Sequence, residues 1–201
     1  MAKVEFFYDY SSPWTYLAFT KISGVCQKYN ATLDWRPILV GGIFNTVNPS
    51  VYEFREKGVP AKAKYSAKDL QDWARFYGLV IKSPTVFPVN SIKVLRGALV
   101  ALDHPEKFLR YSSRVFESYW GEDKDISKDD VLRGIVEEVG LNPVEYFDKI
   151  NRQEYKDRIR VNTDEVMARG GYGTPTIFVN GSMFFGNDRI VLVEEELRRA
   201  K

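Results

Sequence analysis

The strand signals lie at the two ends of the chain, and this distribution constrains the fold more than any other feature of the sequence. Each candidate strand is a short run rich in β-branched and aromatic residues. Strand signals nearly vanish from about residue 41 to 171, so any sheet must join segments that are far apart in the sequence. The four candidate strands are residues 3–8, 32–38, 176–179 and 182–185.

The order of the elements at the two ends predicts the fold class. Ser12 followed by Pro13 is typical of a helix start and predicts a helix over residues 14–28, between the first two strands. Strand, helix and strand of this length form a parallel pair with a right-handed crossover. Asn180-Gly181 predicts a hairpin between the last two strands, before a closing helix over 190–199. We therefore expect an α/β, thioredoxin-like fold of βαβ and ββα halves.

The long middle of the chain reads as helical and interrupts that fold. The β-containing pieces total about 70 residues, which is marginal as an independent core, so the helices must pack on them. We expect a thioredoxin-like domain formed by residues 1–40 and 172–201, with a large all-helical insertion domain at 41–171. The helices predicted in the insertion span residues 61–77, 90–102, 105–120, 127–139, 142–150 and 152–169.

The composition excludes several kinds of chemistry and partner. Lys and Arg total 29 and Asp and Glu total 27, and a balance this even predicts neither nucleic acid nor an anionic membrane as the main partner. Cys26 is the single cysteine and His104 the single histidine, so an internal disulfide and a Cys/His zinc site are excluded, and we expect no metal. Catalysis is then expected to use a hydroxyl, a carboxylate, a borrowed cofactor or a backbone dipole.

The N-terminal residues predict a location. Glu5 and Asp9 fall where an export signal would carry its apolar region. No stretch approaches the roughly 18 apolar residues that a membrane span needs. A soluble protein of the reducing cytoplasm is therefore the expectation.

The start of the first helix is the main candidate site. In thioredoxin-like oxidoreductases a Cys-x-x-Cys pair stands at this corner, but here the four residues are Ser12-Pro13-Trp14-Thr15. Without two thiols the chain cannot shuttle a disulfide, yet the corner keeps free N–H groups, a positive dipole end and a hydroxyl, which suit a glutathione thiolate. Lowering a thiol pKa by about two units needs about 2.7 kcal/mol, so the dipole, worth roughly 0.3–1 kcal/mol, needs the Ser12 hydroxyl, worth about 1.5–3. The alternative is that Ser12 is only an N-cap.

Two further stretches near the C-terminus are candidates. In thioredoxin-like folds the proline at Thr174-Pro175 is cis and faces the helix corner, and the residue before it pairs with a bound peptide. The alternative is a plain trans proline at a strand edge. After the hairpin, Asn187 and Asp188 are candidates for holding an α-amino or γ-glutamyl group, and helix capping is the alternative there.

Together these stretches resemble one family along nearly the whole chain. The segments at 7–14, 172–176 and 185–189 are similar to those of the 2-hydroxychromene-2-carboxylate isomerases and the related kappa-class glutathione transferases. Arg36-Pro37, the Gly41–Phe44 segment and the residues around Pro60 and Asp69 also match. Each motif alone is weak, but the combination is specific.

The resemblance implies a glutathione site and assigns residues to it. Ser12 is the expected catalytic residue and holds the glutathione sulfur, while the Thr174 backbone beside Pro175 pairs with the cysteinyl part. Asn187 and Asp188 would bind the γ-glutamyl end, Lys62 the glycine carboxylate, and Asn48 would lie near the sulfur. The second-substrate pocket is expected to contain Tyr10, Trp14, Phe44, Asn90 and Arg96.

The chain departs from the family pattern in two places. The loop that ends at Asn48 is a residue short of the usual spacing, which leaves Asn45 as an alternative for the same role. Thr174 stands where the family usually has an aliphatic residue, which makes the local pocket more polar.

Three activities remain open. The first is isomerisation of 2-hydroxychromene-2-carboxylate to trans-o-hydroxybenzylidenepyruvate in the degradation of aromatic compounds such as naphthalene, with glutathione as cofactor and Arg96 or Lys62 meeting the substrate carboxylate. The second is a kappa-type transferase or peroxidase acting on small electrophiles. The third is a thioredoxin-like binding module without turnover. The family's transferases often extend further beyond the last helix, which favours the isomerase, and its members are commonly homodimers.

Overall fold

The computed structural model describes residues 1–200, apart from the side chain of Arg55. Its sheet has the strand order β2-β1-β3-β4, with β1 and β2 parallel and the other two pairs antiparallel. Helix α1 (Pro13–Lys28) is the crossover between the two parallel strands. The predicted thioredoxin-like arrangement is confirmed. The strands are β1 (Lys3–Tyr8), β2 (Thr32–Pro37), β3 (Thr176–Val179) and β4 (Ser182–Phe185).

The turn between β3 and β4 explains why that hairpin could be predicted. Asn180 has φ of 48° and Gly181 has φ of 93°. A two-residue hairpin turn that matches the twist of its strands needs positive φ at both central positions, and Asn-Gly is the pair that accepts it. The Asn180 side chain also accepts a hydrogen bond from the Lys3 N–H at 3.0 Å, which ties the turn to the start of β1.

The long middle of the chain is helical, as predicted, although two of its helices were not foreseen. Helices α2 and α3 lie within residues 40–57, where no clear helical pattern is present in the sequence. The helix predicted over 105–120 is α-helical only to Phe116 and ends in a π-helical turn. The remaining elements are α2 (Val40–Thr46), α3 (Ser50–Lys57), α4 (Pro60–Tyr77), α5 (Ile92–Leu102), α6 (Pro105–Phe116), η1 (Glu117–Gly121), α7 (Asp129–Glu138), α8 (Pro143–Asn151), α9 (Gln153–Ala168), η2 (Asn187–Arg189) and α10 (Ile190–Arg199).

Helix α2 depends on a tertiary contact that no local pattern could reveal. It has only seven residues, two of them glycine, and its N-cap residue Leu39 supplies no capping side chain. The Val40 N–H instead donates to Oδ2 of Asp9 at 2.9 Å. A carboxylate from another segment therefore caps this helix, which is why its sequence alone did not predict it.

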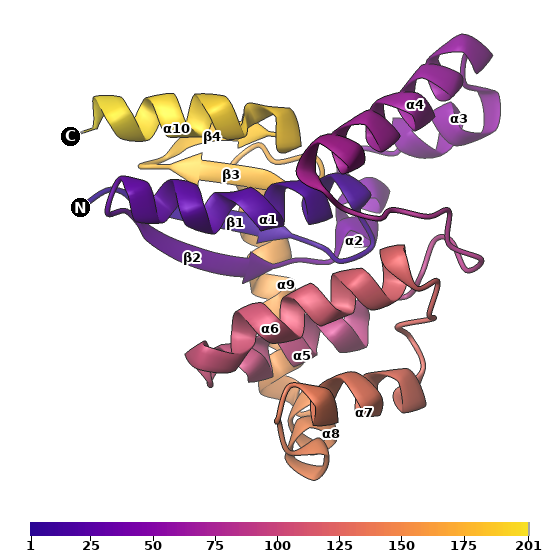
Figure 1. Cartoon of the computed structure of the whole chain (residues 1–201), viewed down its shortest axis with the longest axis vertical. Helices are drawn as coiled ribbons and strands as arrows, with labels where there is room; N and C mark the ends of the chain where they lie inside the picture. The colour runs from indigo at the N-terminus through magenta and orange to yellow at the C-terminus, as the bar shows by residue number, and fades with distance from the viewer. Residues whose placement is uncertain (201) are drawn as a thin grey trace.

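Alternating residues of β1 divide the interior into two cores. Phe6 and Tyr8 face the large core, which includes buried residues of α1, α10 and the helices between α4 and α9. Phe7 faces the other side and packs with Ile43 of α2 and Val166 of α9. In Figure 1, α1 and α10 lie beside the sheet, and α5 to α8 form a layer below it. Helices α3 and α4 project from this body, and we call residues 50–77 the α3–α4 arm.

The large core runs through both predicted domains. It joins Val4 and Ile177 of the sheet to Leu99 and Tyr146 in the helical region without interruption. The division into residues 1–40 with 172–201 and an insertion at 41–171 stays a prediction. Within residues 1–200, none of the helices has both the length and the apolar character that a membrane span requires.

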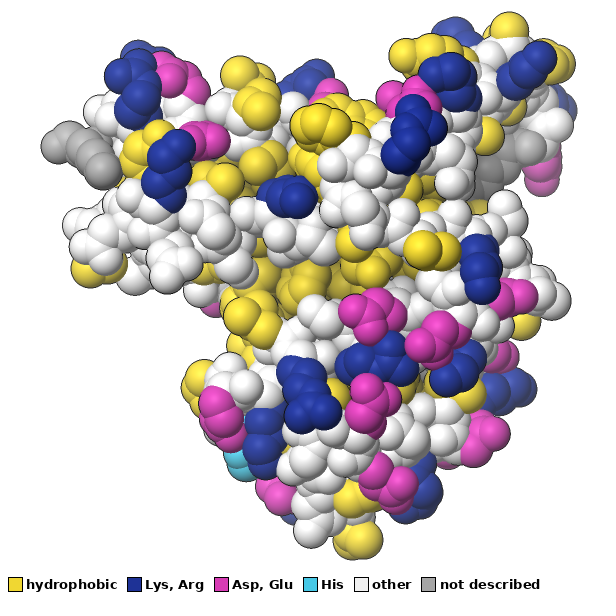
Figure 2. Space-filling view, viewed as in Figure 1, with side chains coloured by type: hydrophobic (Ala, Val, Ile, Leu, Met, Phe, Trp, Pro, Cys, Tyr) yellow, Lys and Arg dark blue, Asp and Glu magenta, His cyan; other side chains and the backbone are white. Residues whose placement is uncertain are grey.

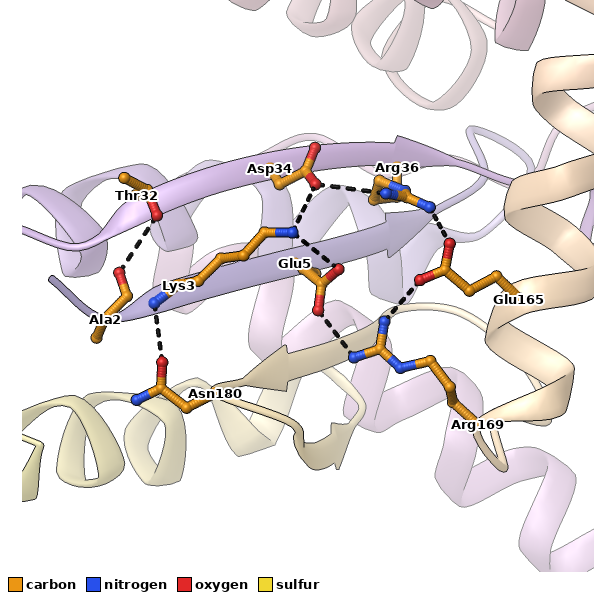
Figure 3. A network of polar contacts seen from close by, with 9 residues as sticks. All are labelled: Ala2, Lys3, Glu5, Thr32, Asp34, Arg36, Glu165, Arg169 and Asn180. Carbon is orange, nitrogen blue, oxygen red and sulfur yellow. Dashed lines mark hydrogen bonds and ion pairs between the residues drawn. The ribbon is translucent and has the colours of Figure 1, made fainter.

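A chain of ion pairs crosses the face of the sheet that carries Phe7, from Lys3 near the start of β1 to Arg36 near the end of β2 (Figure 3). The Lys3 ammonium lies 3.2 Å from Glu5 and 3.3 Å from Asp34. Arg169 lies 2.8 Å from Glu5, and its guanidinium carbon sits 3.7 Å from the centre of the Phe178 ring. We call this group the ion-pair cluster; its members are Lys3, Glu5, Asp34, Arg36, Glu165 and Arg169.

Candidate functional site

A cleft of about 1370 Å³ opens at the start of α1, beneath the α3–α4 arm. In Figure 2 the surface is hollowed where the arm meets the body, with hydrophobic side chains at the edge. The cleft is formed by the first turn of α1, helix α2, the arm, the loop before α5 and the loop before β3. Its aromatic lining residues are Trp14, Phe44, Tyr52, Phe54, Phe87, Tyr172 and Phe185.

Ser12 lies in this cleft and also caps α1. Its backbone is extended, and its Oγ accepts a hydrogen bond from the Thr15 N–H at 3.2 Å. The same hydroxyl donates to the Thr174 carbonyl at 3.3 Å. The two interpretations of Ser12 are thus compatible, because the cap uses a lone pair of the oxygen and leaves its hydrogen available to a second acceptor.

The loop before β3 faces this corner. The Thr174–Pro175 peptide bond is cis, as predicted. Thr174 lines the cleft, whereas Pro175 is buried behind it and is not part of the lining. The Pro175 carbonyl accepts a hydrogen bond from the Gly186 N–H at 3.0 Å, which fixes the loop to the residue after β4.

Asp9 belongs to the motif at residues 7–14, but no role was predicted for its side chain. It is fully buried on the floor of the cleft. Its Oδ1 accepts hydrogen bonds from the Ser11 N–H and the Ser11 hydroxyl, both at 2.9 Å, and its Oδ2 accepts from the Val40 N–H. Burial raises the pKa of the Asp9 carboxyl above its ordinary value, although these donors oppose the rise. An Asp two residues before a Ser is the sequence signal of such an Asx turn.

The structure brings only part of the predicted second-substrate pocket together. Trp14, Phe44 and Asn90 line the cleft. Tyr10 does not, because its ring is fully buried in the large core and its hydroxyl shares a 2.8 Å hydrogen bond with Ser112. Arg96 lies on α5 away from the cleft, where its guanidinium donates to the Ile150 carbonyl at 3.5 Å.

Tyr10 was misplaced because the alternation of β1 continues past the end of the strand and directs its ring into the large core. Tyr8 points into the large core, and the turn after the strand carries Tyr10 to the same side. The Tyr10 carbonyl then accepts a hydrogen bond from the Trp120 indole at 2.9 Å, supplied by the π-helical turn. Arg96 was misplaced because the helix face that it occupies is turned toward α8.

The structure separates the two asparagines that the short loop left as alternatives. Asn48 lines the cleft and donates to the Tyr172 carbonyl at 3.0 Å, while its Oδ1 accepts from Ser50. Asn45 is exposed outside the lining and accepts a hydrogen bond from the Tyr52 hydroxyl at 2.7 Å. Lys62, on α4, also lines the cleft, and its role as a carboxylate partner stays a prediction.

Asn187 and Asp188 lie in the short turn before α10, outside the cleft lining. Asn187 is 3% exposed, and its Nδ2 finds no hydrogen-bond partner within residues 1–200. Asp188 is exposed and pairs with Arg189. Neither side chain caps α10, since its N-cap residue is Arg189, so the capping alternative is not formed. A buried donor without a partner is costly and is a sign of a group that would satisfy it.

The chain's own thiol takes no part in the site. Cys26 is buried in α1, as predicted, and burial raises the pKa of its thiol to about 12. The corner around Ser12 offers a hydroxyl, the first turn of a helix and an extended loop opposite, with aromatic walls around them. Such a site can hold and stabilise an anion brought by a ligand, but it supplies no protein thiolate.

Comparison with known proteins finds relatives that match nearly the whole chain. The chain is 26% identical over 200 residues to 2-hydroxychromene-2-carboxylate isomerase of Pseudomonas putida, across 98% of this chain and 94% of that protein. It is 27% identical over 206 residues to human glutathione S-transferase kappa 1, across 94% of this chain and 88% of that protein.

Solved structures show the same fold. A 2-hydroxychromene-2-carboxylate isomerase superposes with a TM-score of 0.83 at 25% identity, covering 98% of this chain and 95% of that one. A probable DsbA oxidoreductase of Streptomyces coelicolor superposes with a TM-score of 0.82 at 14% identity, covering 100% and 90%. The family model of the DSBA-like thioredoxin domain matches residues 3–198, so the chain belongs to the family of DSBA-like thioredoxin domains.

Proposed function

We propose that this protein is a glutathione-dependent enzyme that isomerises 2-hydroxychromene-2-carboxylate to trans-o-hydroxybenzylidenepyruvate. The observation that carries the proposal is the Ser12 hydroxyl, which lies in an aromatic cleft at the start of α1, opposite the cis Thr174–Pro175 loop. The relatives named as isomerases and kappa transferases support it. Because the reaction needs reduced glutathione, we expect it to run in a reducing cytoplasm.

The residues present fit glutathione. Ser12 suits the sulfur, the Thr174 backbone the cysteinyl part, and Lys62 and Asn48 line the same cleft. The unpartnered Nδ2 of Asn187, buried two residues beyond Phe185 of the lining, suits the γ-glutamyl end together with Asp188. Bound there, glutathione would supply a nucleophilic thiolate for reversible addition to the conjugated substrate.

In this proposal the Ser12 hydroxyl stabilises the thiolate of bound glutathione. Its oxygen accepts from the Thr15 N–H, and its hydrogen can turn from the Thr174 carbonyl, 3.3 Å away, to a thiolate, which is a stronger acceptor. A hydrogen bond to a charged group is worth about 1.5–3 kcal/mol. Together with the dipole of α1, this lowers the thiol pKa toward neutrality and keeps the sulfur ionised, and no general base is required.

A kappa-type transferase is the second candidate, and one observation favours it. The predicted guanidinium partner of a substrate carboxylate, Arg96, lies away from the cleft. The cleft still contains Lys57 and Lys62, but its walls are mainly apolar. A small apolar electrophile without a carboxylate would suit such walls as well as the chromene acid does.

The first experiment follows the absorbance of 2-hydroxychromene-2-carboxylate over time, with and without glutathione. We expect turnover by the wild type only when glutathione is present. Ser12→Ala should lower the rate by about tenfold to a hundredfold, which corresponds to a lost hydrogen bond to a charged group. Ser12→Asp is the matched control, because Asp caps a helix as well as Ser does but carries a like charge that repels a thiolate.

The outcomes separate the activities. Restoration of turnover by Ser12→Asp would show that Ser12 acts only as a cap. If the protein is retained on a column of immobilised glutathione but does not turn over the chromene acid, the result would favour the transferase. Failure to bind glutathione at all would leave a binding module and contradict both enzymes.

A further inference from the structure

We propose that the buried hydroxyls of Thr15 and Thr174 form a positioning pair that sets the Ser12 hydroxyl in line for an anion in the cleft. This inference rests on the proposed function, because the anion it concerns is the thiolate of bound glutathione. It gives a role to two residues that depart from the usual pattern. Thr15 stands where thioredoxin-like oxidoreductases have their second cysteine, and Thr174 stands where the family usually has an aliphatic residue.

The two hydroxyls meet in the interior behind Ser12. Thr15 is fully buried and Thr174 is 8% exposed, and their Oγ1 atoms lie 2.9 Å apart. The Thr174 Oγ1 also accepts a hydrogen bond from the Asp9 N–H at 3.2 Å, and it lies 3.4 Å from the Phe7 carbonyl. The pair thus joins the end of β1, the first turn of α1 and the loop before β3.

The neighbouring groups determine where the hydroxyl hydrogens of Thr15 and Thr174 point. A hydroxyl has one hydrogen to donate and two lone pairs that accept. Thr174 satisfies every group when it accepts from the Asp9 N–H and from the Thr15 hydroxyl, and donates to the Phe7 carbonyl. In this arrangement Thr15 donates toward Thr174, so the three segments are held by a directed set of hydrogen bonds rather than by apolar contact alone.

The same two residues hold Ser12 from both sides. Thr15 donates its backbone N–H to the Ser12 Oγ at 3.2 Å, and Thr174 offers its carbonyl to the Ser12 hydrogen at 3.3 Å. The hydroxyl pair fixes the separation of these two backbone groups, and with it the direction of the Ser12 O–H. The bond to Thr174 is long for an O–H donor, so the hydrogen can turn to a stronger acceptor at small cost.

An apolar pair of the same shape would keep the packing but lose this alignment. Valine matches threonine in shape, yet at 174 it would leave the buried Asp9 N–H without its acceptor. The loop would then be free to shift relative to α1, and the Ser12 O–H would spend more time on the wrong acceptor. The expected effect is on the ionisation of the bound thiol rather than on how the tripeptide as a whole is held.

The test is a pH titration of bound glutathione, followed by the ultraviolet absorbance of its thiolate, in the full chain. Thr15→Val and Thr174→Val should each weaken ionisation of the bound thiol about fivefold, the size of one hydrogen bond. The double variant should weaken it no further than the stronger single variant, because the pair acts as a unit. Thr15→Ser and Thr174→Ser should restore the wild-type titration, since serine keeps the hydroxyl.

A matched control lies on the same helix. Thr20 is exposed on α1, and its hydroxyl donates to the Leu17 carbonyl at 2.8 Å, so Thr20→Val removes a hydroxyl without touching the corner. We expect its titration to equal that of the wild type. If Thr174→Val does not fold, Thr15→Val decides, because it leaves the Asp9 N–H bonded to Thr174.

The inference and the proposed function can fail separately. If Ser12→Ala weakens ionisation of the bound thiol while both valine variants titrate like the wild type, the positioning pair is wrong and the proposed function stands. If the valine variants only lower the free energy of unfolding, the two hydroxyls are structural and the inference is again wrong. If the wild type does not lower the pKa of bound glutathione, the proposed function fails and the inference fails with it.

Discussion

Strand β1 carries two polar clusters of opposite kind, one at each end. The ion-pair cluster at its start is made of full charges that are partly exposed to solvent on the face of the sheet that carries Phe7 (Figure 3). At its other end Asp9, Ser12, Thr15 and Thr174 form a group that we call the hydroxyl corner. This corner is mostly buried and neutral apart from one carboxylate.

The difference follows from what each end of the strand has to do. Exposed ion pairs are screened by solvent and tolerate loss of a partner, so they contribute little each. Buried hydroxyls are directional, and each lost partner leaves an unsatisfied group in a low-dielectric interior. The hydroxyl corner can therefore fix the geometry of a site, whereas the ion-pair cluster mainly covers one face of the sheet.

The largest expected effect of a single change tests this contrast at the hydroxyl corner. Asp9→Ala removes the acceptor of the Ser11 N–H and of the Val40 N–H, which begins α2. We expect a loss of about 3 kcal/mol in the free energy of unfolding, since each orphaned buried donor costs about 1–3. Urea denaturation measures it. Asp34→Ala in the ion-pair cluster is the matched control, with an expected loss of about 0–1 kcal/mol; equal losses would contradict the contrast.

The second prediction concerns pH. Burial raises the pKa of Asp9 in the folded protein above its unfolded value, so the folded state binds the proton more tightly. Its contribution to stability is then complete below the unfolded pKa of about 3.9. It is lost as the pH rises through the folded pKa, with a slope of at most about 1.4 kcal/mol per pH unit.

Asp9→Asn isolates this effect, because the variant cannot titrate at residue 9 and all other carboxylates are retained. We expect the unfolding free energy of the wild type to fall relative to that of Asp9→Asn as the pH rises from about 4. Denaturation curves of both proteins at a series of pH values measure the difference. A difference that rises with pH would mean that the donors around Asp9 outweigh its burial.

A smaller effect is expected at the partly buried side of the ion-pair cluster. Arg169 bonds Glu5 and Glu165, each at 2.8 Å, and its hydrogen bond lowers the pKa of the Glu5 carboxyl. Arg169→Met should keep most of the contact with Phe178 and cost about 1 kcal/mol, within the range of a charged hydrogen bond at a screened site. Glutathione binding, measured by calorimetry, should stay unchanged; a weakened affinity would mean that the two clusters are coupled.

The smallest expected effect is at the exposed side of the same cluster. The Lys3 side chain is 52% exposed and bridges Glu5 and Asp34. Lys3→Ala should cost at most about 0.5 kcal/mol in low salt, and the cost should vanish at about 0.5 M salt because the charges are then screened. Thermal unfolding in the two salt concentrations checks this. A cost that persists in high salt would show that the Lys3 stem contributes by packing.

Sequence patterns predicted the elements whose signals are local. The hairpin at Asn180-Gly181 needs positive φ at adjacent residues, and the start of α1 needs a hydroxyl before a proline, so both could be read directly. Helix α2 could not be predicted, because its cap comes from Asp9, 31 residues earlier. The π-helical turn after Phe116 likewise showed no local signal.

The candidate site divides in the same way. Ser12, Trp14 and Thr174 are fixed by elements with local signals, and all three line the cleft. Tyr10 and Arg96 were assigned by residue type and resemblance, and packing carried both away from the cleft.

The sequence by itself determined the order of strands and helices, the absence of a second thiol and the hydroxyl at the helix corner. These follow from residue identity and short-range chemistry. The tertiary structure alone decided which side chains share the cleft and that Asp9 caps α2. It alone also brought Thr15 and Thr174 together across 159 residues of chain. Such contacts depend on how distant segments pack, and packing is a property of the whole core.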